Sequence, residues 1–467
     1  MKRSKQRIAV IGTGITGLTT AYKLQKKINE ENLPYELLIL ESAIHSGGNI
    51  FTMKLDDYYF DLGVDSIDVR EKDALELIEE LGLEDQLVYS QNGKEDLFIH
   101  NQMYHLNFPT YKGIPEKLKY IWKYKSLTLS GKLAFLRESY LPTITNDQDV
   151  DISSYMKQRI GNEMTDYIVE PFLSSNYMGD IEQVGIKSSK NPLYDLEQEY
   201  GSFTKAIQEH PELLDGDGNY VTFERGLRVL TEKIIEKLGG NIRYNQRVTE
   251  IKPSSENTYI LDINNKQQVR VGAVCIASGP SSYNSFFDDE KLIKWADNLQ
   301  KSSMGHMLFS FPKGSIKRPP KGFGVLVPTR SESYITSVTL LNKKWPFYGQ
   351  DQEFVGVEFG RMGDNFLMSL SNKQLEKFIL KELQKMIQIT EEPIYRIVKR
   401  WPEAIVQYKE DHNQRKSFIR QHIRKEYPGV YIAGNGFDGY GINYCIRQAN
   451  EVSDKVLNYI KANRIKK

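Results

Sequence analysis

The chain has 467 residues, of which 40% are hydrophobic and 26% are charged, so its composition excludes a disordered or a collagen-like protein. Its 62 Lys and Arg residues and 61 Asp and Glu residues leave a formal charge of +1, and without a strongly basic field we expect no nucleic-acid partner. The only cysteines are Cys275 and Cys445, which excludes a disulfide framework and a cysteine-based zinc site and fits a reducing compartment.

The first residues superficially resemble a signal peptide, because the basic stretch 1–7 precedes an apolar run. Three glycines interrupt that run, it lacks a cleavage site of small residues, and it continues into the charged stretch 23–27. No window of about 18 apolar residues predicts a membrane-spanning helix. We therefore expect a cytoplasmic protein.

The N-terminal region predicts a βαβ unit. Residues 7–11 read as a buried strand, a glycine loop follows at 12–17, and a helix then presents Leu18, Ala21, Tyr22 and Leu24 on its inner side. A second apolar run, 37–40, ends at Glu41. This spacing is typical of a nucleotide-binding unit.

The later elements are predicted from shorter patterns. We expect a helix over 73–81, a mainly helical region over 110–210, a helix on the stripe 227–238, and short strands at 241–244, 258–263 and 271–277. Strands are predicted at 323–327, 334–341 and 354–359, then a helix capped by Ser371, a strand at 430–433 and a helix from about Asn443. The βα elements at both ends indicate one discontinuous α/β domain with the middle of the chain inserted into it.

The glycine loop has the residue types that hold a pyrophosphate. Gly12 permits the tight turn, Gly14 lets the backbone approach the phosphates, and Gly17 allows close packing of helix on strand. Glu41, 24 residues after Gly17, stands where a carboxylate accepts hydrogen bonds from ribose hydroxyls. The alternative is a structural βα turn with Glu41 as a solvated strand end.

Three further features favour FAD over NAD. They are the Ser46-Gly47-Gly48 turn after Glu41, the glycine-rich turn 434–441 before the last helix, and the strand with small residues at 274–279. The sequence contains no second complete G-x-G-x-x-G motif, so a dedicated NAD(P)H domain is not expected. Such a protein is an oxidase or dehydrogenase that draws electrons from its substrate.

The chain resembles the porphyrinogen oxidases of haem synthesis in Gram-positive bacteria, within the flavin amine oxidase and protoporphyrinogen oxidase superfamily. The resemblance covers nearly the whole chain and is carried by segments 8–18, 46–50, 63–66, 170–180, 342–346, 430–434 and 436–442. It implies noncovalent FAD and O2-dependent, six-electron oxidation of coproporphyrinogen III to coproporphyrin III with three H2O2 produced, and it implies no catalytic acid or base and no metal. The seven histidines show no metal-ligand spacing.

The resemblance also implies a fold of three parts. These are an FAD-binding Rossmann-like domain (1–75, 222–290 and 400–467), a substrate-binding domain on a mixed α+β sheet (76–95 and 291–399), and a helical domain (96–221). Carried over by position, the FAD contacts are Gly12, Thr13, Gly14, Ile15, Thr16, Gly17, Glu41, Ser42, Gly48, Asn49, Gly63, Val64, Asp65, Ser66, Val248, Trp401, Gly441 and Ile442.

Three positions depart from the family pattern. Glu71 stands at a usual basic residue implicated in holding a substrate carboxylate, Ser175 at a glycine that faces the substrate, and Asn49 at a basic residue beside the flavin. Arg70 and Lys72 remain candidates for binding the propionates, with an ordinary surface charge as the alternative. The departures leave open protoporphyrinogen as the substrate, an amine or polyene oxidase or desaturase, and a non-catalytic paralogue that binds porphyrin or flavin.

Residues 110–142 interleave basic side chains with aromatic ones. This pattern suits peripheral contact with an anionic membrane at its inner face or with another enzyme of the haem pathway. The alternative is that these residues form an ordinary solvated helical face without a partner.

Overall fold

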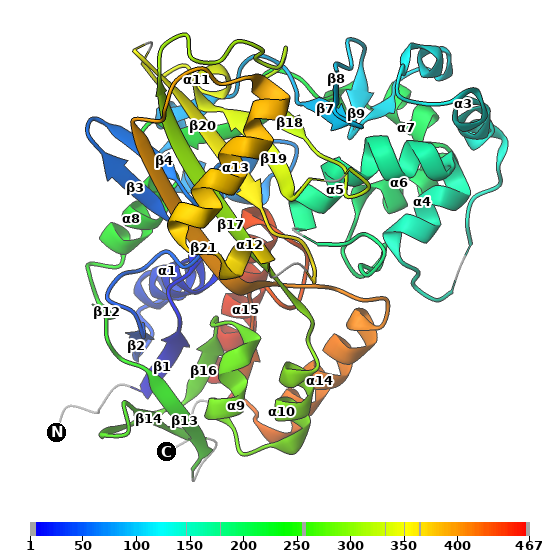
Figure 1. The fold of residues 1–467 in the computed structure, drawn as a ribbon. Coiled ribbons are helices and arrows are strands. Elements are labelled where there is room, and N and C mark those ends of the chain that lie inside the picture. The colour runs from blue at the N-terminus through cyan, green and yellow to red at the C-terminus, as the bar shows by residue number, and fades with distance from the viewer. Residues whose placement is uncertain are drawn as a thin grey trace.

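The computed structural model describes residues 6–145, 147–177, 179–254, 258–331, 333–349, 351–363 and 366–463, so the basic stretch 1–5 lies outside the described residues. Its first sheet is parallel and has the strand order β12-β2-β1-β16-β22 (Figure 1). The strands are β1 (Gln6–Ile11), β2 (Tyr35–Leu40), β12 (Ile242–Arg243), β16 (Ala273–Ile276) and β22 (Val430–Ile432). The sheet therefore combines both ends of the chain with its middle.

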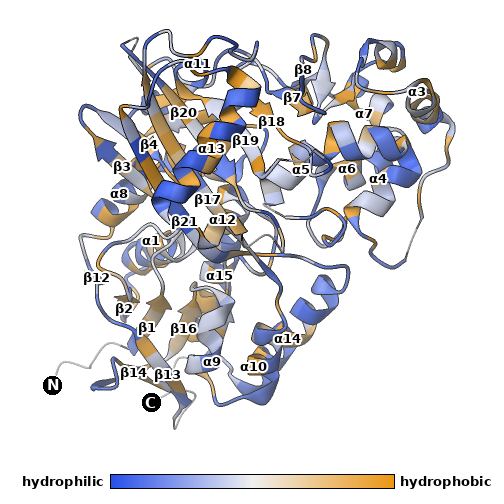
Figure 2. Ribbon diagram, viewed as in Figure 1, coloured by the Kyte–Doolittle hydropathy of each residue, from blue (hydrophilic) through white to orange (hydrophobic). Residues whose placement is uncertain are grey.

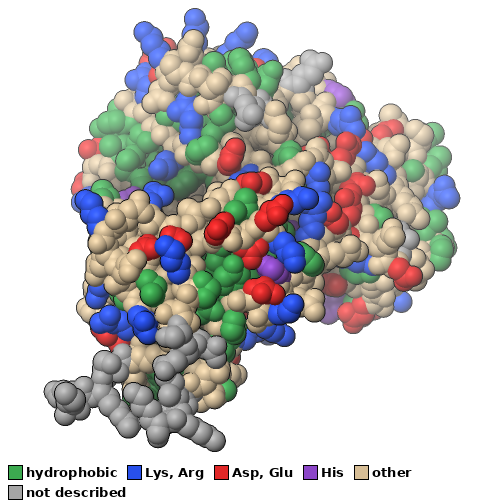
Figure 3. Space-filling model, turned by 90° about the horizontal axis from the view of Figure 1, so that it is seen from below, with side chains coloured by type: hydrophobic (Ala, Val, Ile, Leu, Met, Phe, Trp, Pro, Cys, Tyr) green, Lys and Arg blue, Asp and Glu red, His purple; other side chains and the backbone are tan. Residues whose placement is uncertain are grey.

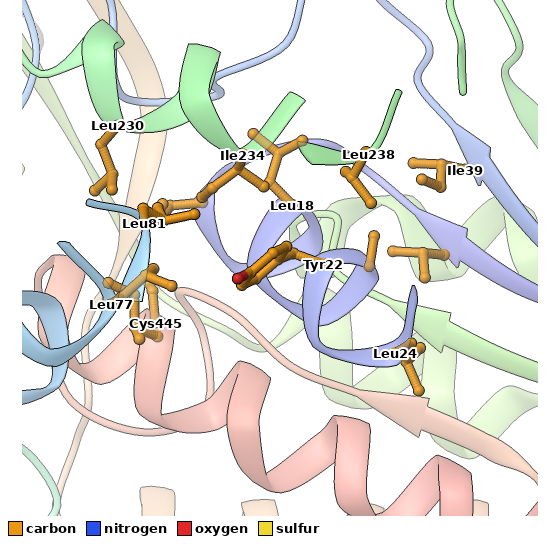
Figure 4. Close-up of a cluster of buried hydrophobic side chains, with 14 of the residues drawn as sticks. Leu18, Tyr22, Leu24, Ile39, Leu77, Leu81, Leu230, Ile234, Leu238 and Cys445 are labelled. Carbon is orange, nitrogen blue, oxygen red and sulfur yellow. The ribbon is translucent and has the colours of Figure 1, made fainter. Parts of the chain in front are cut away.

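Both faces of this sheet are covered, as its continuous apolar strands require. Ile8 and Val10 pack on one side in a core with α1 (Ile15–Glu30), α2 (Asp73–Glu80), α8 (Arg228–Lys237) and α15 (Ile442–Ala462). Figure 4 shows this core, with Leu18 and Tyr22 of α1 between α8 and α2. On the opposite side, Ala9 and Ile11 pack with the antiparallel sheet β13 (Val248–Pro253), β14 (Tyr259–Ile263) and β15 (Gln267–Val271).

The second sheet is mixed and has the order β21-β17-β20-β19-β18-β7-β8. Its strands are β7 (Asp96–Ile99), β8 (Gln102–Tyr104), β17 (Lys301–Pro312), β18 (Gly324–Leu326), β19 (Ile335–Leu340), β20 (Gln352–Phe359) and β21 (Tyr395–Val406), and only the β18–β7 pair is parallel. Helix α13 (Asn372–Ile387) lies across it, with apolar residues toward the sheet and polar ones outward (Figure 2). Ser371 starts this helix with a capping box, as predicted.

Helices form a separate lobe beside the mixed sheet (Figure 1). It contains α3 (Leu129–Leu136), α4 (Ile152–Ile160), the π-helix η4 (Met164–Val169), α5 (Glu170–Tyr177), α6 (Pro192–Tyr200) and α7 (Phe203–Glu209), packed around their own apolar core. Residues 110–210 are thus mainly helical, as expected, apart from the hairpin β9 (Thr110–Tyr111) and β10 (Ile114–Pro115).

Smaller elements connect these parts. The strands are β3 (Thr52–Leu55), β4 (Tyr58–Asp61), β5 (Ile67–Asp68), β6 (Leu87–Tyr89) and β11 (Tyr220–Phe223). The helices are α9 (Tyr283–Phe286), α10 (Glu290–Asp297), α11 (Leu341–Lys344), α12 (Phe366–Ser369), α14 (His412–Glu426) and the 3₁₀ turns Glu84–Gln86, Leu118–Lys123, Glu138–Tyr140, Pro211–Leu213 and Pro280–Ser282. None of the helices within the described ranges is both long and apolar enough to cross a bilayer.

The predicted fold class, a discontinuous nucleotide-binding α/β unit with a mixed-sheet and a helical part, is confirmed. The strand pairing crosses two expected boundaries: β7 and β8 join the mixed sheet although they lie within 96–221, the range expected for the helical part, and β21 continues past residue 400. The division into three domains stays a prediction. On the face shown in Figure 3, acidic and basic side chains are interspersed rather than separated by sign.

Candidate functional site

The carboxyl ends of the parallel strands meet at one edge of the first sheet. β1 runs into Gly12, whose N–H donates to Leu40 O at 2.9 Å, and Ala277, which follows β16, donates to Ile11 O at 2.8 Å. The N–H of Ala433 donates to Ile276 O at 3.0 Å. In open α/β sheets, ligands bind in the crevice outside this edge.

The glycine loop is shaped for close packing on one side and open on the other. Gly12 has φ +95°, and a Cβ on Gly17 would lie 2.0 Å from Gly12 O, so α1 starts directly against the loop. A Cβ on Gly14 would meet its nearest neighbour, the Cα of Gly48, only at 3.9 Å. The open side of the loop is therefore a cradle that any side chain at position 14 would fill.

Two helices begin at this edge without a side-chain cap. Gly14 is the N-cap of α1, and Gly441, with φ +92°, is the N-cap of α15. In the part of the chain that the structure describes, no side chain accepts a capping hydrogen bond from the first N–H groups of either helix. The first N–H groups of a helix have no intrahelical acceptor, and its N-terminus carries a positive dipole end. Both termini therefore suit the anionic groups of a dinucleotide.

Glu41 lies against the glycine loop. Its Oε2 accepts hydrogen bonds from the N–H of Thr13 at 2.9 Å and from the Oγ1 of Thr13 at 2.6 Å, while its Oε1 accepts from the N–H of Ala43 at 2.8 Å. The carboxylate is held at the end of β2 with its side chain half-buried. This arrangement fits a ligand hydroxyl at the carboxylate, as the spacing predicts. Ser42 is exposed beside it.

Two further segments predicted to contact FAD lie next to this loop. Gly47 N–H donates to Thr13 O at 2.9 Å, and Val64 N–H donates to Asn49 O at 3.4 Å, so segments 46–50 and 63–66 pack together. Trp401 joins them from β21, because its indole Nε1 donates to Leu62 O at 3.0 Å.

Of the remaining predicted contacts, Ile442 begins α15, and Val248 is 3% exposed in the same core as Ile11 and Leu40. The structure thus brings the predicted FAD-binding residues to one edge of the sheet or directly beneath it.

A small hollow lies beside two of the predicted substrate residues. Arg70 and Ser175 both line it, together with Phe172, Tyr220 and Leu326, and with the charged side chains of Lys94, Glu95, Lys112 and Asp215. Lys72 does not belong to the lining; it is exposed at the start of α2. The walls combine aromatic and apolar groups with an excess of cationic side chains.

Arg70 is already paired inside this hollow. Its guanidinium lies 2.7 Å from Asp68 and 3.2 Å from Asp215, and it donates to Leu213 O at 3.0 Å. The Oγ of Ser175 donates to Phe172 O at 3.1 Å. Both side chains therefore already have hydrogen-bond partners within the protein. The residues next to position 70 along the chain gave no sign of the partners of Arg70 at positions 213 and 215.

Sequence reasoning missed Lys94 and the role of Lys112 in this hollow. It counted Lys112 with the basic surface of residues 110–142, yet Tyr111 and Tyr124 of that segment are buried, at 4% and 1% exposed. The sequence feature that could have placed Lys112 in a hairpin is the Lys112-Gly113 pair between Thr110-Tyr111 and Ile114-Pro115, since a residue followed by glycine between two short strand segments is typical of a hairpin loop.

The fold and the edge of the first sheet define a dinucleotide-binding oxidoreductase of the flavoprotein type. The family model described as flavin containing amine oxidoreductase matches residues 15–457, and the chain belongs to this family. Its cofactor is therefore FAD, for which the uncapped helix ends, the open cradle at Gly14 and the carboxylate of Glu41 are suited.

The relatives extend along the whole chain. The coproporphyrinogen III oxidase of Bacillus subtilis (strain 168) is 29% identical over 98% of this chain and 100% of its own length. That of Staphylococcus aureus (strain NCTC 8325 / PS 47) is 26% identical over 96% of this chain and 98% of its own length. A solved structure from Exiguobacterium sp. 255-15, a provisionally assigned protoporphyrinogen oxidase, has a TM-score of 0.86 at 24% identity and covers 97% of this chain and 99% of its own.

Proposed function

We propose that this protein oxidises coproporphyrinogen III to coproporphyrin III with O2 as the acceptor. The observation that carries the proposal is the end-to-end match to two relatives named coproporphyrinogen III oxidase. The hollow beside Arg70 and Ser175 supports it, since the cationic side chains in its mainly polar wall suit the carboxylates that the porphyrinogen bears. The reaction removes six hydrogens in three two-electron rounds, and three O2 become three H2O2.

In this proposal the chain's residues bind and orient rather than transfer protons. Bound FAD supplies the two-electron acceptor for hydrogen leaving the bridging carbons of the substrate. The N–H groups that follow Gly14 bind the pyrophosphate, Glu41 accepts from the ribose hydroxyls, and the start of α15 at Gly441 stabilises negative charge on the ring. Trp401, which packs against Gly63, would form part of the wall beside the bound ring; a Cβ on Gly63 would lie 3.4 Å from the indole.

The direct test uses the purified, FAD-loaded protein with coproporphyrinogen III in air. We expect porphyrin fluorescence well above autoxidation, three H2O2 for each porphyrin, and anaerobic bleaching of the flavin by the porphyrinogen. Comparison of kcat/KM with protoporphyrinogen decides between the two porphyrinogens. Flavin reduction by an amine or polyene, with none by porphyrinogens, would instead select another oxidase or desaturase, and porphyrin binding without flavin reduction would indicate a non-catalytic paralogue.

We further propose that the surface of residues 118–140 contacts an anionic membrane peripherally. Four large apolar side chains there are more than half exposed, namely Trp122, Leu129, Leu133 and Tyr140, and exposed lysines such as Lys119, Lys123 and Lys125 accompany them. Flotation with vesicles that contain phosphatidylglycerol tests this proposal. Trp122→Glu should abolish flotation; equal flotation of both proteins would contradict it, and capture of another haem-pathway enzyme without lipid binding would replace the membrane with a protein partner.

A further inference from the structure

The hollow beside Arg70 contains three cationic side chains whose surroundings differ. Arg70 is neutralised by Asp68 and Asp215, as described above. Lys94 donates from its Nζ to Phe108 O at 2.7 Å and to the Oγ1 of Thr110 at 2.9 Å. Lys112, in contrast, makes no side-chain hydrogen bond and no ion pair with any residue in the described ranges. Its Nζ lies 5.4 Å from the centre of the Tyr111 ring.

Lys112 is held firmly in this place. It forms, with Gly113, the two-residue loop between β9 and β10. The hydroxyl of Tyr124 donates to Gly113 O at 2.6 Å, and a Cβ on Gly113 would come within 3.1 Å of Ile168 and Phe172. The hairpin is therefore clamped against the helical lobe, and the lysine cannot leave the wall of the hollow by a simple movement of a surface loop.

Lysine at position 112 is energetically unfavourable for the fold. Lys112 has φ +48° and Gly113 has φ +78°, and two positive φ values are the signature of a turn that strongly prefers Asn-Gly or Asp-Gly. The half-buried ammonium makes no direct ion pair within the described residues, so the carboxylates of Asp68, Asp215 and Glu71 offset its desolvation cost only from a distance. Burial and the nearby charge of Arg70 lower the pKa of Lys112. Asparagine would remove both costs, so a lysine here indicates a role outside the fold.

Glu71 provides the complementary observation. Its Oε2 is buried and makes no hydrogen bond within the described part of the chain, and its charge acts on Lys112 across the same region. A carboxylate oxygen and an ammonium that both lack hydrogen bonds within the described residues thus share this region, and the ammonium is available to an anionic ligand.

We propose that Lys112 binds a carboxylate of the substrate at the wall of this hollow. This inference rests on the proposed porphyrinogen substrate and identifies the side chain that recognises its propionate. An ammonium–carboxylate contact in a partly desolvated wall forms a strong, charge-assisted hydrogen bond. Arg70, already paired with two carboxylates, then acts as a support of the wall rather than as the contact itself.

The test measures binding of coproporphyrin III and of its tetramethyl ester to the FAD-loaded protein by porphyrin fluorescence. Lys112→Asn should weaken binding of the free acid about ten- to a hundredfold, the range expected for one hydrogen bond to a charged group. It should leave binding of the ester unchanged, because the ester has no carboxylate. The same variant should keep or raise Tm, since asparagine suits the turn, and Lys112→Arg should restore most of the affinity.

Lys266→Asn, at an exposed lysine outside the proposed binding surfaces, is the matched control and should leave both affinities unchanged. Equal affinity of wild type and Lys112→Asn for the free acid would overturn the inference, as would an equal loss for acid and ester. Failure of the proposed function looks different: wild type would then bind coproporphyrin III in a Lys112-dependent way yet leave coproporphyrinogen III unoxidised.

Discussion

The Nζ of Lys344 lies 2.7 Å from the Oδ2 of Asp65. This contact joins segment 63–66, beside the nucleotide edge of the first sheet, to α11 in the connection between β19 and β20 of the mixed sheet. Lys344 is buried, with its side chain 8% exposed, whereas that of Asp65 is 37% exposed. The pair therefore fixes the position of the cofactor-binding part relative to the mixed sheet.

Lys344→Met should loosen this connection. We expect the variant to lose about 1–3 kcal/mol of unfolding free energy, because a charge-assisted contact of Asp65 disappears and, among the described residues, Ser66 is left to donate to its carboxylate. FAD affinity should fall as well, if segment 63–66 contacts the cofactor as proposed. Guanidinium unfolding and FAD titration measure the two effects. Lys385→Met, at an exposed lysine, should change stability by less than about 0.5 kcal/mol.

Gly14→Val should fold but lose FAD. The open space at Gly14 accommodates a Cβ in the protein, so the side chain would occupy the cradle proposed for the pyrophosphate. The purified variant should be colourless with a nearly unchanged far-UV circular dichroism spectrum. Gly216→Ala is the control, since its Cβ would meet its nearest neighbour, the Oδ1 of Asn219, only at 4.0 Å and since it lies outside the segments predicted to contact FAD. A yellow, fully loaded Gly14→Val protein would refute the assigned position of the pyrophosphate.

Arg159→Met should destabilise the helical lobe. The guanidinium is fully buried, donates to Leu141 O at 3.0 Å and Pro142 O at 2.8 Å, and lies 3.4 Å from Glu197 and 3.8 Å from Glu138. Removing it leaves buried carboxylates without their cation, which costs about 3–5 kcal/mol. Chemical denaturation gives the change directly. Arg225→Met removes an exposed ion pair and should have little effect; similar losses for both variants would show that Arg159 has no special role.

Stability should fall with decreasing pH through His412. This ring is 2% exposed and its Nε2 lies 3.0 Å from Phe437 O, and burial lowers its pKa to about 4. The unfolded chain, with a histidine pKa of about 6.5, binds the proton first. This stabilising contribution is therefore present above pH 6.5 and is lost as the pH falls toward 4, and the loss between pH 7 and pH 5 is ~2 kcal/mol.

His412→Gln keeps a donor for Phe437 O and removes this titration. Its unfolding free energy should change less than that of wild type between pH 7 and pH 5, as measured by denaturant titrations at each pH. His45→Gln, at an exposed histidine, should retain the wild-type slope. An unchanged slope in His412→Gln would assign the acid sensitivity to other groups.

Local patterns predicted the elements that depend on local physics. The loop 12–17 and the capping box at Ser371 depend on residues a few positions apart, and the structure contains both. The long strands β17 and β21 were missed because Gly305 interrupts the apolar pattern of one, while charged residues and Pro402 lie in the other. β21 is an edge strand, where proline is tolerated.

The candidate site shows the same limit. Sequence spacing predicted Glu41 beside the glycine loop because both belong to one βαβ unit. The partners of Arg70 include Asp215, which is 145 positions away, and the loop residue Gly113, next to Lys112, packs against Ile168 and Phe172 in the helical lobe. Such contacts depend on how distant segments pack, and no local pattern records them.

The composition of the first sheet has a consequence for synthesis. Its strands and helix α15 come from residues 6–11, 35–40, 242–243, 273–276, 430–432 and 442–462. The ribosome therefore synthesises the segments that form the nucleotide edge of this sheet over almost the whole time of translation. The early strands β1 and β2 therefore lack their final neighbours until the later strands are synthesised. Non-local pairing of this kind favours slow folding, and the unpaired apolar strands are exposed to aggregation in the meantime. We expect riboflavin-derived cofactor to be captured only after the last helix leaves the exit tunnel, and arrested nascent chains that end before residue 430 should remain colourless.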